Sequence, residues 1–341
     1  MKFTIAKNVF SNALSLLQPF LDKKDASQMI SHILLEAEET GVWLSATDHT
    51  KGFKIFISAN VEVRGAATAN GTKLLSNVNA LNNSISIERV ENIVIMKSGR
   101  SRMRLDSFDE LLFPKFPEVA KADKPLSAKA LRDASKVVFS TDHTHPKAFF
   151  QGVFVGDDIV GSDGHIMSLV NNTELGLECI VPKHMIKAIN DFHCEERYIT
   201  VGETNIIDRS LKHFMFSRVI NAKYPNYKQI ISKAGAYSES IAMPKAEFFE
   251  AVMLCKIAWH EVMLKFCGDR VEFYSLDPER SVKTSVSIDT VNEVEIALNI
   301  GYVLGFLKEA STEYKMEFNK VYGAVKFSSK GLISYIQPVV V

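Results

Sequence analysis

The residues best suited to acid–base or metal chemistry are nine histidines, several of which lie beside aspartates. Imidazole and carboxylate groups side by side can move protons or bind a metal ion. The densest groups are Asp142-His143, Asp163-Gly164-His165 and His193-Cys194. A zinc site needs three or four ligands, however, and neither a His-Glu-x-x-His nor a Cys-x-x-Cys pattern occurs. We therefore expect no metal and no other cofactor.

A nucleophilic centre is also poorly supported. The segment Gly161-Ser162-Asp163-Gly164 comes near the Gly-x-Ser-x-Gly elbow of hydrolases but lacks its spacing. Aspartates in polar turns commonly accept hydrogen bonds from nearby backbone N–H groups. We predict that turn-forming role here, and no enzymatic activity. An enzyme that uses Asp163 and His165 is the alternative.

Basic side chains lie on one face of two predicted helices. Lys129, Arg132 and Lys136 are spaced at i, i+3 and i+7, and Lys183 and Lys187 at i, i+4. These residues are either ordinary solvated charges or a surface that contacts DNA phosphates without reading the base sequence. Asp133 lies on the first of these faces and dilutes its charge.

Composition indicates a soluble globular protein of two or three domains. The 341 residues are 46% hydrophobic and 23% charged, and 40 basic residues balance 40 acidic ones. A net charge of zero excludes an evenly basic surface. No apolar run approaches the roughly 18–20 residues of a membrane span. We expect no membrane partner, a cytoplasmic location and, from four scattered cysteines, inert thiols.

A weak internal repeat sets the expected architecture. Amphipathic helices are predicted at residues 5–21, 127–139 and 244–258, and shorter ones at 72–81, 182–190 and 301–310. Between them lie polar turns that contain Asp48, Asp163 and Asp277, 115 and 114 residues apart. We predict an α+β fold of three copies, each with two helices and antiparallel strands, at residues 1–119, 120–232 and 233–341.

Strand-like runs follow each opening helix and are predicted to form hairpins. In the first copy they are residues 33–37 and 41–45. In the third copy they are residues 264–266 and 271–274, around the turn signal Gly268-Asp269-Arg270.

Short motifs in a fixed order resemble the bacterial sliding clamp, the β subunit of DNA polymerase III. They run along the whole chain: residues 1–5 (MKFTI), 44–48 (LSATD), 97–102 (KSGRSR), 113–117 (FPKFP), 162–165 (SDGH), 181–183 (VPK), 224–227 (YPNY) and 299–304 (NIGYVL). The resemblance implies three clamp domains and a head-to-tail homodimeric ring around double-stranded DNA, bound without sequence preference. Such a ring would confer processivity on a replicative polymerase. It would also dock the clamp loader and repair polymerases through short linear peptides.

The resemblance also implies a hydrophobic peptide pocket between the second and third domains. Its wall would comprise Phe150, Gly164, His165, Ile166, Met167, Pro225, Gln229, Ile230, Ile336, Pro338, Val339 and Val341. The family usually has basic residues at the positions of Ile166 and Gln229, and Met-Pro-Met in place of Gln337-Pro338-Val339. The pocket of this chain would therefore be more apolar and less charged.

Two further sets of residues follow from the resemblance. The dimer interface would comprise Arg100, Arg102, Met103 and Leu105 of one subunit against Met253 and Leu254 of the other. The DNA contacts would comprise Lys23, Lys24, Lys129, Arg132, Lys136, Lys147, Phe149, Lys183 and Lys187. Near Glu279 and Arg280 the chain lacks the family's glutamate-rich strand. This motivates an alternative, a clamp-like monomer that binds clamp partners as a regulator or decoy without encircling DNA.

Overall fold

The computed structural model describes the chain except residues 25–27, 83, 172–176, 195, 235, 276–281, 320–322 and 341. Its described part divides into two compact units, each built from two segments of the chain. Unit 1 comprises Met1–Leu126 and Ala188–Val219, and unit 2 comprises Ser127–Lys187 and Ile220–Val341. The predicted domain boundaries at 119/120 and 232/233 stay predictions, because each unit contains strands from two predicted copies.

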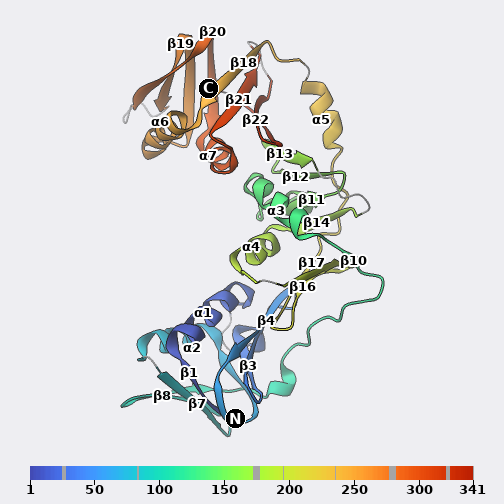
Figure 1. Cartoon of the computed structure of the whole chain (residues 1–341), viewed down its shortest axis with the longest axis vertical. Helices are drawn as coiled ribbons and strands as arrows, with labels where there is room; N and C mark the ends of the chain where they lie inside the picture. Colours follow the sequence, from blue (N-terminus) through green and yellow to red (C-terminus); the bar gives the residue numbers. More distant parts are fainter. Residues whose placement is uncertain are drawn as a thin grey trace. The chain divides into compact units, whose positions relative to one another are not determined.

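Unit 1 contains two antiparallel sheets with the helices α1 (Lys7–Leu17) and α2 (Gly71–Ala80), which lie side by side (Figure 1). The first sheet has the order β5 (Asn60–Val63), β1 (Lys2–Ala6), β7 (Ser84–Val90), β8 (Ile93–Ser98), β9 (Ser101–Asp106). The second has the order β10 (Lys124–Pro125), β15 (Tyr198–Val201), β16 (Asn205–Arg209), β17 (His213–Arg218), β4 (Lys51–Ser58), β3 (Gly41–Thr47), β2 (His32–Ala37), β6 (Gly65–Asn70).

Unit 2 contains a second eight-stranded sheet, a long two-stranded ribbon and four helices. The sheet has the order β14 (Cys179–Pro182), β11 (Gly152–Val155), β12 (Asp158–Ser162), β13 (Ile166–Asn171), β23 (Leu332–Ile336), β22 (Val325–Ser329), β21 (Glu313–Phe318), β18 (Glu239–Pro244). The ribbon consists of β19 (Glu261–Ser275) and β20 (Lys283–Asn299). The helices are α3 (Ala128–Val137), α5 (Tyr227–Ala234), α6 (Lys245–Ala258) and α7 (Ile300–Glu309). The short helix α4 (Lys183–Asp191) crosses the boundary between the units at Lys187.

The predicted helices form, with small shifts at their ends. Ser127 caps α3, because its hydroxyl accepts a hydrogen bond from the backbone N–H of Ala130 at 3.0 Å. The first helix begins at Lys7 instead of Ile5, because Ile5 pairs with Ile85 in the first sheet. Strand pairing there outweighs the helical spacing of the apolar side chains.

The predicted third-copy hairpin is wrong. Residues 261–275 form one continuous strand, β19, and its register against β20 shifts on both sides of Gly268. Gly268 has a φ of +64°, a conformation that glycine adopts at little cost. The local turn signal is therefore a β-bulge within a long strand.

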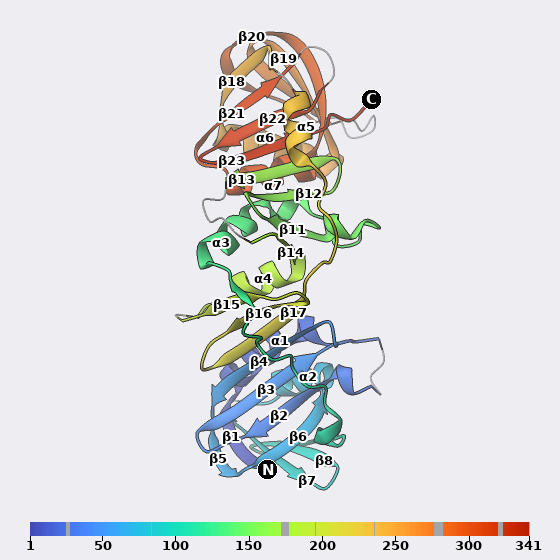
Figure 2. The same ribbon diagram turned by 90° about the vertical axis from the view of Figure 1, so that its right-hand side faces the viewer.

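The large sheet of unit 2 joins strands from two predicted copies. Strand β13 pairs with β23, and Ser168 lies opposite Ser334. Their hydroxyls are 2.7 Å apart, and the Ser140 hydroxyl donates to Ser168 at 2.5 Å. All three serines are fully buried, where an unpaired hydroxyl would be costly. The two contacts give each hydroxyl a hydrogen-bond partner. On one face of this sheet lies α5 (Figure 2), and its residues Tyr227 and Ile231 pack against side chains of β12, β13 and β23.

No helix in the described ranges is both long and apolar enough to cross a membrane.

Candidate functional site

Two turns with the same hydrogen bonds occur in the two units. In unit 1, the Thr47 hydroxyl donates to the carbonyl of Lys51 at 2.8 Å, and Asp48 Oδ1 accepts from the N–H groups of Thr50 and Lys51, both at 2.9 Å. The residue at the tip, His49, has a φ of +71°. This turn joins β3 to β4.

The turn between β12 and β13 in unit 2 repeats this pattern. The Ser162 hydroxyl donates to the carbonyl of Ile166 at 2.7 Å, and Asp163 Oδ1 accepts from the N–H groups of His165 and Ile166 at 2.9 and 3.0 Å. Gly164, at the position of His49, has a φ of +96°. The prediction that these aspartates close turns is confirmed for Asp48 and Asp163, whereas Asp277 lies outside the described residues.

A strand from the following copy ends at each turn in the same way. In unit 1 the N–H of Arg218, at the end of β17, donates to the carbonyl of Thr50 at 2.8 Å. In unit 2 the N–H of Gln337, just after β23, donates to the carbonyl of His165 at 2.9 Å. Val339 then donates to the carbonyl of Ala297 at 2.9 Å, so the tail is held at two points.

Most of the predicted peptide-pocket residues lie near this contact between the Asp163 turn and the tail after β23. His165 and Gly164 are exposed at the turn, and a β-carbon added to Gly164 would lie 3.6 Å from the Phe150 ring. Pro338 and Val339 are half-buried, and Ile230 on α5 is 53% exposed. Pro225 is half-buried and Gln229 is exposed. Val341 lies outside the described residues.

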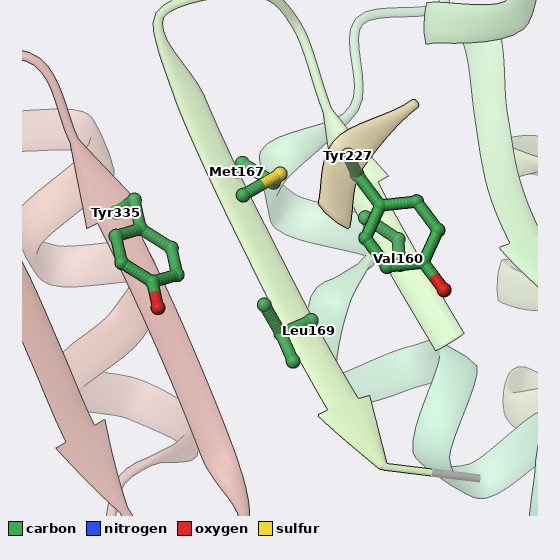
Figure 3. Packing of buried hydrophobic residues seen from close by; sticks show 5 residues of the cluster. All are labelled: Val160, Met167, Leu169, Tyr227 and Tyr335. Carbon is green, nitrogen blue, oxygen red and sulfur yellow. The ribbon is translucent and has the colours of Figure 1, made fainter. Parts of the chain in front are cut away.

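Three of the predicted wall residues are buried instead of open to solvent. Ile166 and Ile336 pair across β13 and β23, and Met167 lies beneath the aromatic side chains of the segment that precedes and begins α5. Figure 3 shows Met167 and Leu169 on β13, with Tyr335 of β23 on one side and Tyr227 on the other. The buried Ile166, Met167 and Ile336 therefore lie beneath the exposed residues of the candidate peptide site.

Aromatic side chains fix the segment that precedes α5. The rings of Tyr224 and Phe154 stack with centroids 4.9 Å apart, and the Tyr227 hydroxyl donates to Asp158 Oδ2 at 2.8 Å. Burial, followed by the hydrogen bond to Asp158, raises the pKa of Tyr227 well above its usual range. The segment that contains Pro225, Gln229 and Ile230 is thereby held against the sheet.

One contact at the Asp163 turn could not be predicted from any sequence pattern. The Tyr302 hydroxyl, in the first turn of α7, donates to Asp163 Oδ2 at 2.7 Å. Tyr302 follows Asp163 by 139 residues, and no local pattern links the two.

On α3 the predicted DNA-contacting cations are partly neutralised. Asp133 is nearly buried and accepts hydrogen bonds from Lys129 at 3.1 Å and Lys136 at 2.7 Å. Burial favours the neutral acid, but these hydrogen bonds outweigh it, and the pKa of Asp133 lies below its usual range. Arg132 is exposed on the same helix.

The other predicted DNA contacts are of two kinds. Lys183 is half-buried and donates to the carbonyl of Thr141, and burial, followed by the charge of Lys187, lowers its pKa. Phe149 is half-buried against Phe150 and Tyr224. The remaining residues are exposed lysines: Lys23, Lys24, Lys147 and Lys187.

Five of the six predicted interface residues are exposed or half-buried within their own unit. In unit 1, β9 is an edge strand of its sheet, with Arg102 exposed, Met103 half-buried and Leu105 buried, and Arg100 is exposed in the turn before it.

In unit 2, Met253 and Leu254 are exposed on α6. The exposed Ile257 and Trp259, which no sequence motif pointed to, continue this apolar surface.

A serine, a histidine and an aspartate align in unit 1. The Ser210 hydroxyl is 2.7 Å from His213 Nδ1, and His213 Nε2 is 3.3 Å from Asp208 Oδ1. The imidazole and the carboxylate are both buried, and Ser210 is half-buried between β16 and β17. Among the described residues no group of three or more histidine, cysteine, aspartate or glutamate side chains could hold a metal ion.

Comparison with known proteins identifies the family. Residues 1–117 match the family described as DNA polymerase III beta subunit, N-terminal domain. The beta sliding clamp of Helicobacter pylori strain J99 is 30% identical over 346 aligned positions, which cover 94% of this chain and 92% of the relative. The chain belongs to the β sliding clamp family.

Solved structures agree over the full length. The crystal structure of the H. pylori β clamp bound to a DNA ligase peptide matches with a TM-score of 0.87 and 28% sequence identity, and the match covers 100% of both chains. The DNA polymerase III β subunit of Pseudomonas aeruginosa, at 18% identity and a TM-score of 0.83, shares the fold. The sequence-based predictions of family, α+β fold and function are confirmed: the chain is a DNA sliding clamp, a non-catalytic subunit of DNA polymerase III.

Replacing Asp133 by asparagine should strengthen sequence-independent DNA binding. The change keeps the shape of the side chain but releases Lys129 and Lys136 for phosphate contacts. Each added phosphate contact steepens the slope of log K against log salt by about 0.9. We expect a slope steeper by about one to two and several-fold tighter binding at low salt, measured by fluorescence anisotropy with a duplex.

The control is Asp157→Asn, which removes the same charge from the exposed pair with Lys228. If both variants shift DNA binding equally, the effect is one of net charge and the specific role of Asp133 is wrong.

Proposed function

We propose that this clamp closes as a head-to-tail homodimer around duplex DNA. We also propose that it recruits its partners at the surface where β13, β23 and α5 meet. The proposal rests on one observation above all: the turn at His165, the tail after β23 and the segment that carries Pro225 to Ile230 lie together in unit 2. The exposed Ile230 and the half-buried Pro338 and Val339 offer apolar contacts, which suit a short linear peptide.

The expected partners are the replicative polymerase, the clamp loader and repair polymerases. The H. pylori relative was crystallised with a DNA ligase peptide, which supports peptide binding by this family. This chain has Ile166 and Gln229 at the two positions where other members of the family usually have basic residues. We therefore propose that this clamp depends less on charge in its peptide than they do.

On the DNA side, the proposed contacts are lysines and arginines without base-reading geometry. Phosphate contacts hold the duplex in any register, so the ring can slide. The pairing of Lys129 and Lys136 with Asp133 keeps each contact weak. Because the proposed binding partner is duplex DNA, we propose that the protein is cytoplasmic.

Deleting residues 339–341 should weaken peptide binding at least tenfold and leave the fold intact. The deletion removes the half-buried Val339 and its hydrogen bond to Ala297, but leaves β23 in place. Binding is measured by fluorescence anisotropy with a labelled peptide that carries the DNA ligase segment bound by the H. pylori clamp. Thermal denaturation checks the fold.

The matched control is Leu211→Ser, which removes an apolar side chain as exposed as Val340, both at 88%, but in unit 1. Unchanged peptide affinity after the deletion would refute the placement of the peptide site.

In solution the protein should be a dimer. Light scattering at micromolar concentration should give a mass near twice 38.1 kDa. Leu254→Asp should reduce the mass to that of one chain, because it places a charge in an apolar contact. The control is Glu250→Ala, an exposed polar position on the same helix.

A wild-type mass of 38.1 kDa would instead favour the clamp-like monomer that binds partners without encircling DNA.

A further inference from the structure

One face of the large sheet of unit 1 carries a row of alternating aromatic and basic side chains. Tyr198 of β15 lies opposite Arg209 of β16, and Arg209 lies opposite Phe214 of β17. Phe214 in turn lies opposite Lys54 of β4. Directly opposite residues of antiparallel strands point to the same face, with β-carbons about 4.5–5.5 Å apart. The four side chains therefore form one continuous row across adjacent strands, which we call the Tyr198 row (Figure 2).

The Tyr198 row faces solvent, whereas the other face of the same strands belongs to the core. Tyr198 is 65% exposed and Arg209 is also exposed. Phe214 and Lys54 are half-buried. The neighbouring residues that pair across these strands on the other face are all buried: Ile199, Asp208, Met215 and Phe53. The row thus presents aromatic rings and cations together on an open surface.

The segment that contains Phe116 borders the row on one side without covering it. The ring of Phe116 lies against the buried Phe216, with centroids 5.1 Å apart. Its contact with Phe214 is edge to face, with centroids 5.9 Å apart, so Phe214 is supported but stays half-buried. Lys115, the residue before Phe116, is exposed and adds a cation to this border.

The other border of the row is a pair of aromatic rings held in place by Lys54. Trp43 of β3 lies opposite Phe56 of β4, with ring centroids 5.2 Å apart. The Lys54 ammonium lies 5.0 Å from the centroid of the Trp43 ring and donates to Glu36 at 2.9 Å. The N–H of Phe56 donates to the carbonyl of Lys212 at 2.9 Å, which fixes the turn between β16 and β17. A surface held in this way loses little freedom when a ligand binds.

The charges around the row are mainly positive. Three exposed cations form no ion pair within the described part of the chain: Arg209, Lys115 and Lys212. Lys54 is paired with Glu36. Glu118 and Glu196 are exposed carboxylates outside the row. The surface is therefore suited to a ligand with repeated negative charge.

Rings that alternate with cations suit a single-stranded nucleic acid. Unpaired bases stack on aromatic side chains, and phosphates contact lysine and arginine. A duplex keeps its bases stacked inside, so it would use the cations but not the rings. An acidic peptide would also use the cations, but it has no series of flat rings to match Tyr198 and Phe214.

We propose that the Tyr198 row binds single-stranded DNA, with bases stacked on Tyr198 and Phe214 and phosphates at Arg209 and the nearby lysines. This function goes beyond enclosing a duplex and binding partner peptides. It depends on neither of them, because every residue that it needs belongs to unit 1.

The test compares Tyr198→Ala and Arg209→Glu with the wild type in the full-length protein. The probe is a labelled oligo(dT) of about 16 nucleotides, the upper end of the usual site size of one single-strand-binding fold. Stacking of one base on one ring is worth about tenfold in affinity. We expect fluorescence anisotropy to show about tenfold weaker binding for Tyr198→Ala. Arg209→Glu should weaken binding at least as much at low salt and reduce the salt slope by about 0.7.

Two controls match these changes, and one variant should restore binding. Leu112→Ala removes an apolar side chain of unit 1 that is 70% exposed but has no ring. Lys330→Glu reverses one exposed charge in unit 2. Neither should change affinity more than twofold. Tyr198→Trp keeps a ring at this position, so it should keep the affinity and add indole fluorescence that the oligonucleotide quenches.

Several results would overturn the inference. They are no oligo(dT) binding by the wild type, unchanged binding by Tyr198→Ala, or equal effects of Arg209→Glu and Lys330→Glu. If poly-glutamate of the same charge binds as tightly as oligo(dT), the surface accepts any polyanion and the stacking role is wrong.

The outcome is distinct from failure of the proposed function. Tyr198→Ala should bind a duplex of the same length and the labelled DNA ligase peptide as the wild type does. Loss of either together with oligo(dT) binding would indicate a general defect and contradict a separate site.

Discussion

The backbone pairing of strands from successive copies is the constraint on which the rest of this structure depends. Strand β23 joins β13 in unit 2, and β17 joins β4 in unit 1. Such pairing satisfies edge N–H and C=O groups that would otherwise be open. In unit 2 the buried Ser168 and Ser334 fix the register, because a shift by one residue would separate their hydroxyls. That register places Gln337 at His165 and so creates the candidate peptide site.

The Asp48 turn of unit 1 and the Asp163 turn of unit 2 show that the same hydrogen bonds can hold different exposed side chains. Both use an aspartate turn with a left-handed residue at its tip and the same bond to the following strand. Around the turn of unit 1 the exposed side chains are polar, including His49, Thr50 and Arg218. In unit 2 the tail continues through Pro338 and Val339. The hydrogen bonds determine the shape of each turn. The side chains around the turn determine whether it suits a peptide.

Local features were predictable from the sequence, whereas long-range ones were not. The Ser127 cap and the aspartate turns depend on neighbours within a few residues, so their chemistry is visible in a short window. The long strand β19 was missed because its partner β20 lies beyond that window and Gly268 resembles a turn. The burial of Ile166, Met167 and Ile336, and the bond between Tyr302 and Asp163, arise only when distant segments meet. The family resemblance supplied the candidate residues but not their exposure.

The central claim is that this protein stays on DNA because it encloses it, and retention on circular DNA tests that claim most directly. The clamp is loaded on a nicked circular duplex by a clamp loader, the free protein is removed, and the bound fraction is followed before and after cutting the circle once. We predict stable retention on the circle and rapid loss after linearisation, because a ring that contacts only phosphates slides off free ends. Equal retention on circular and linear DNA would contradict the account.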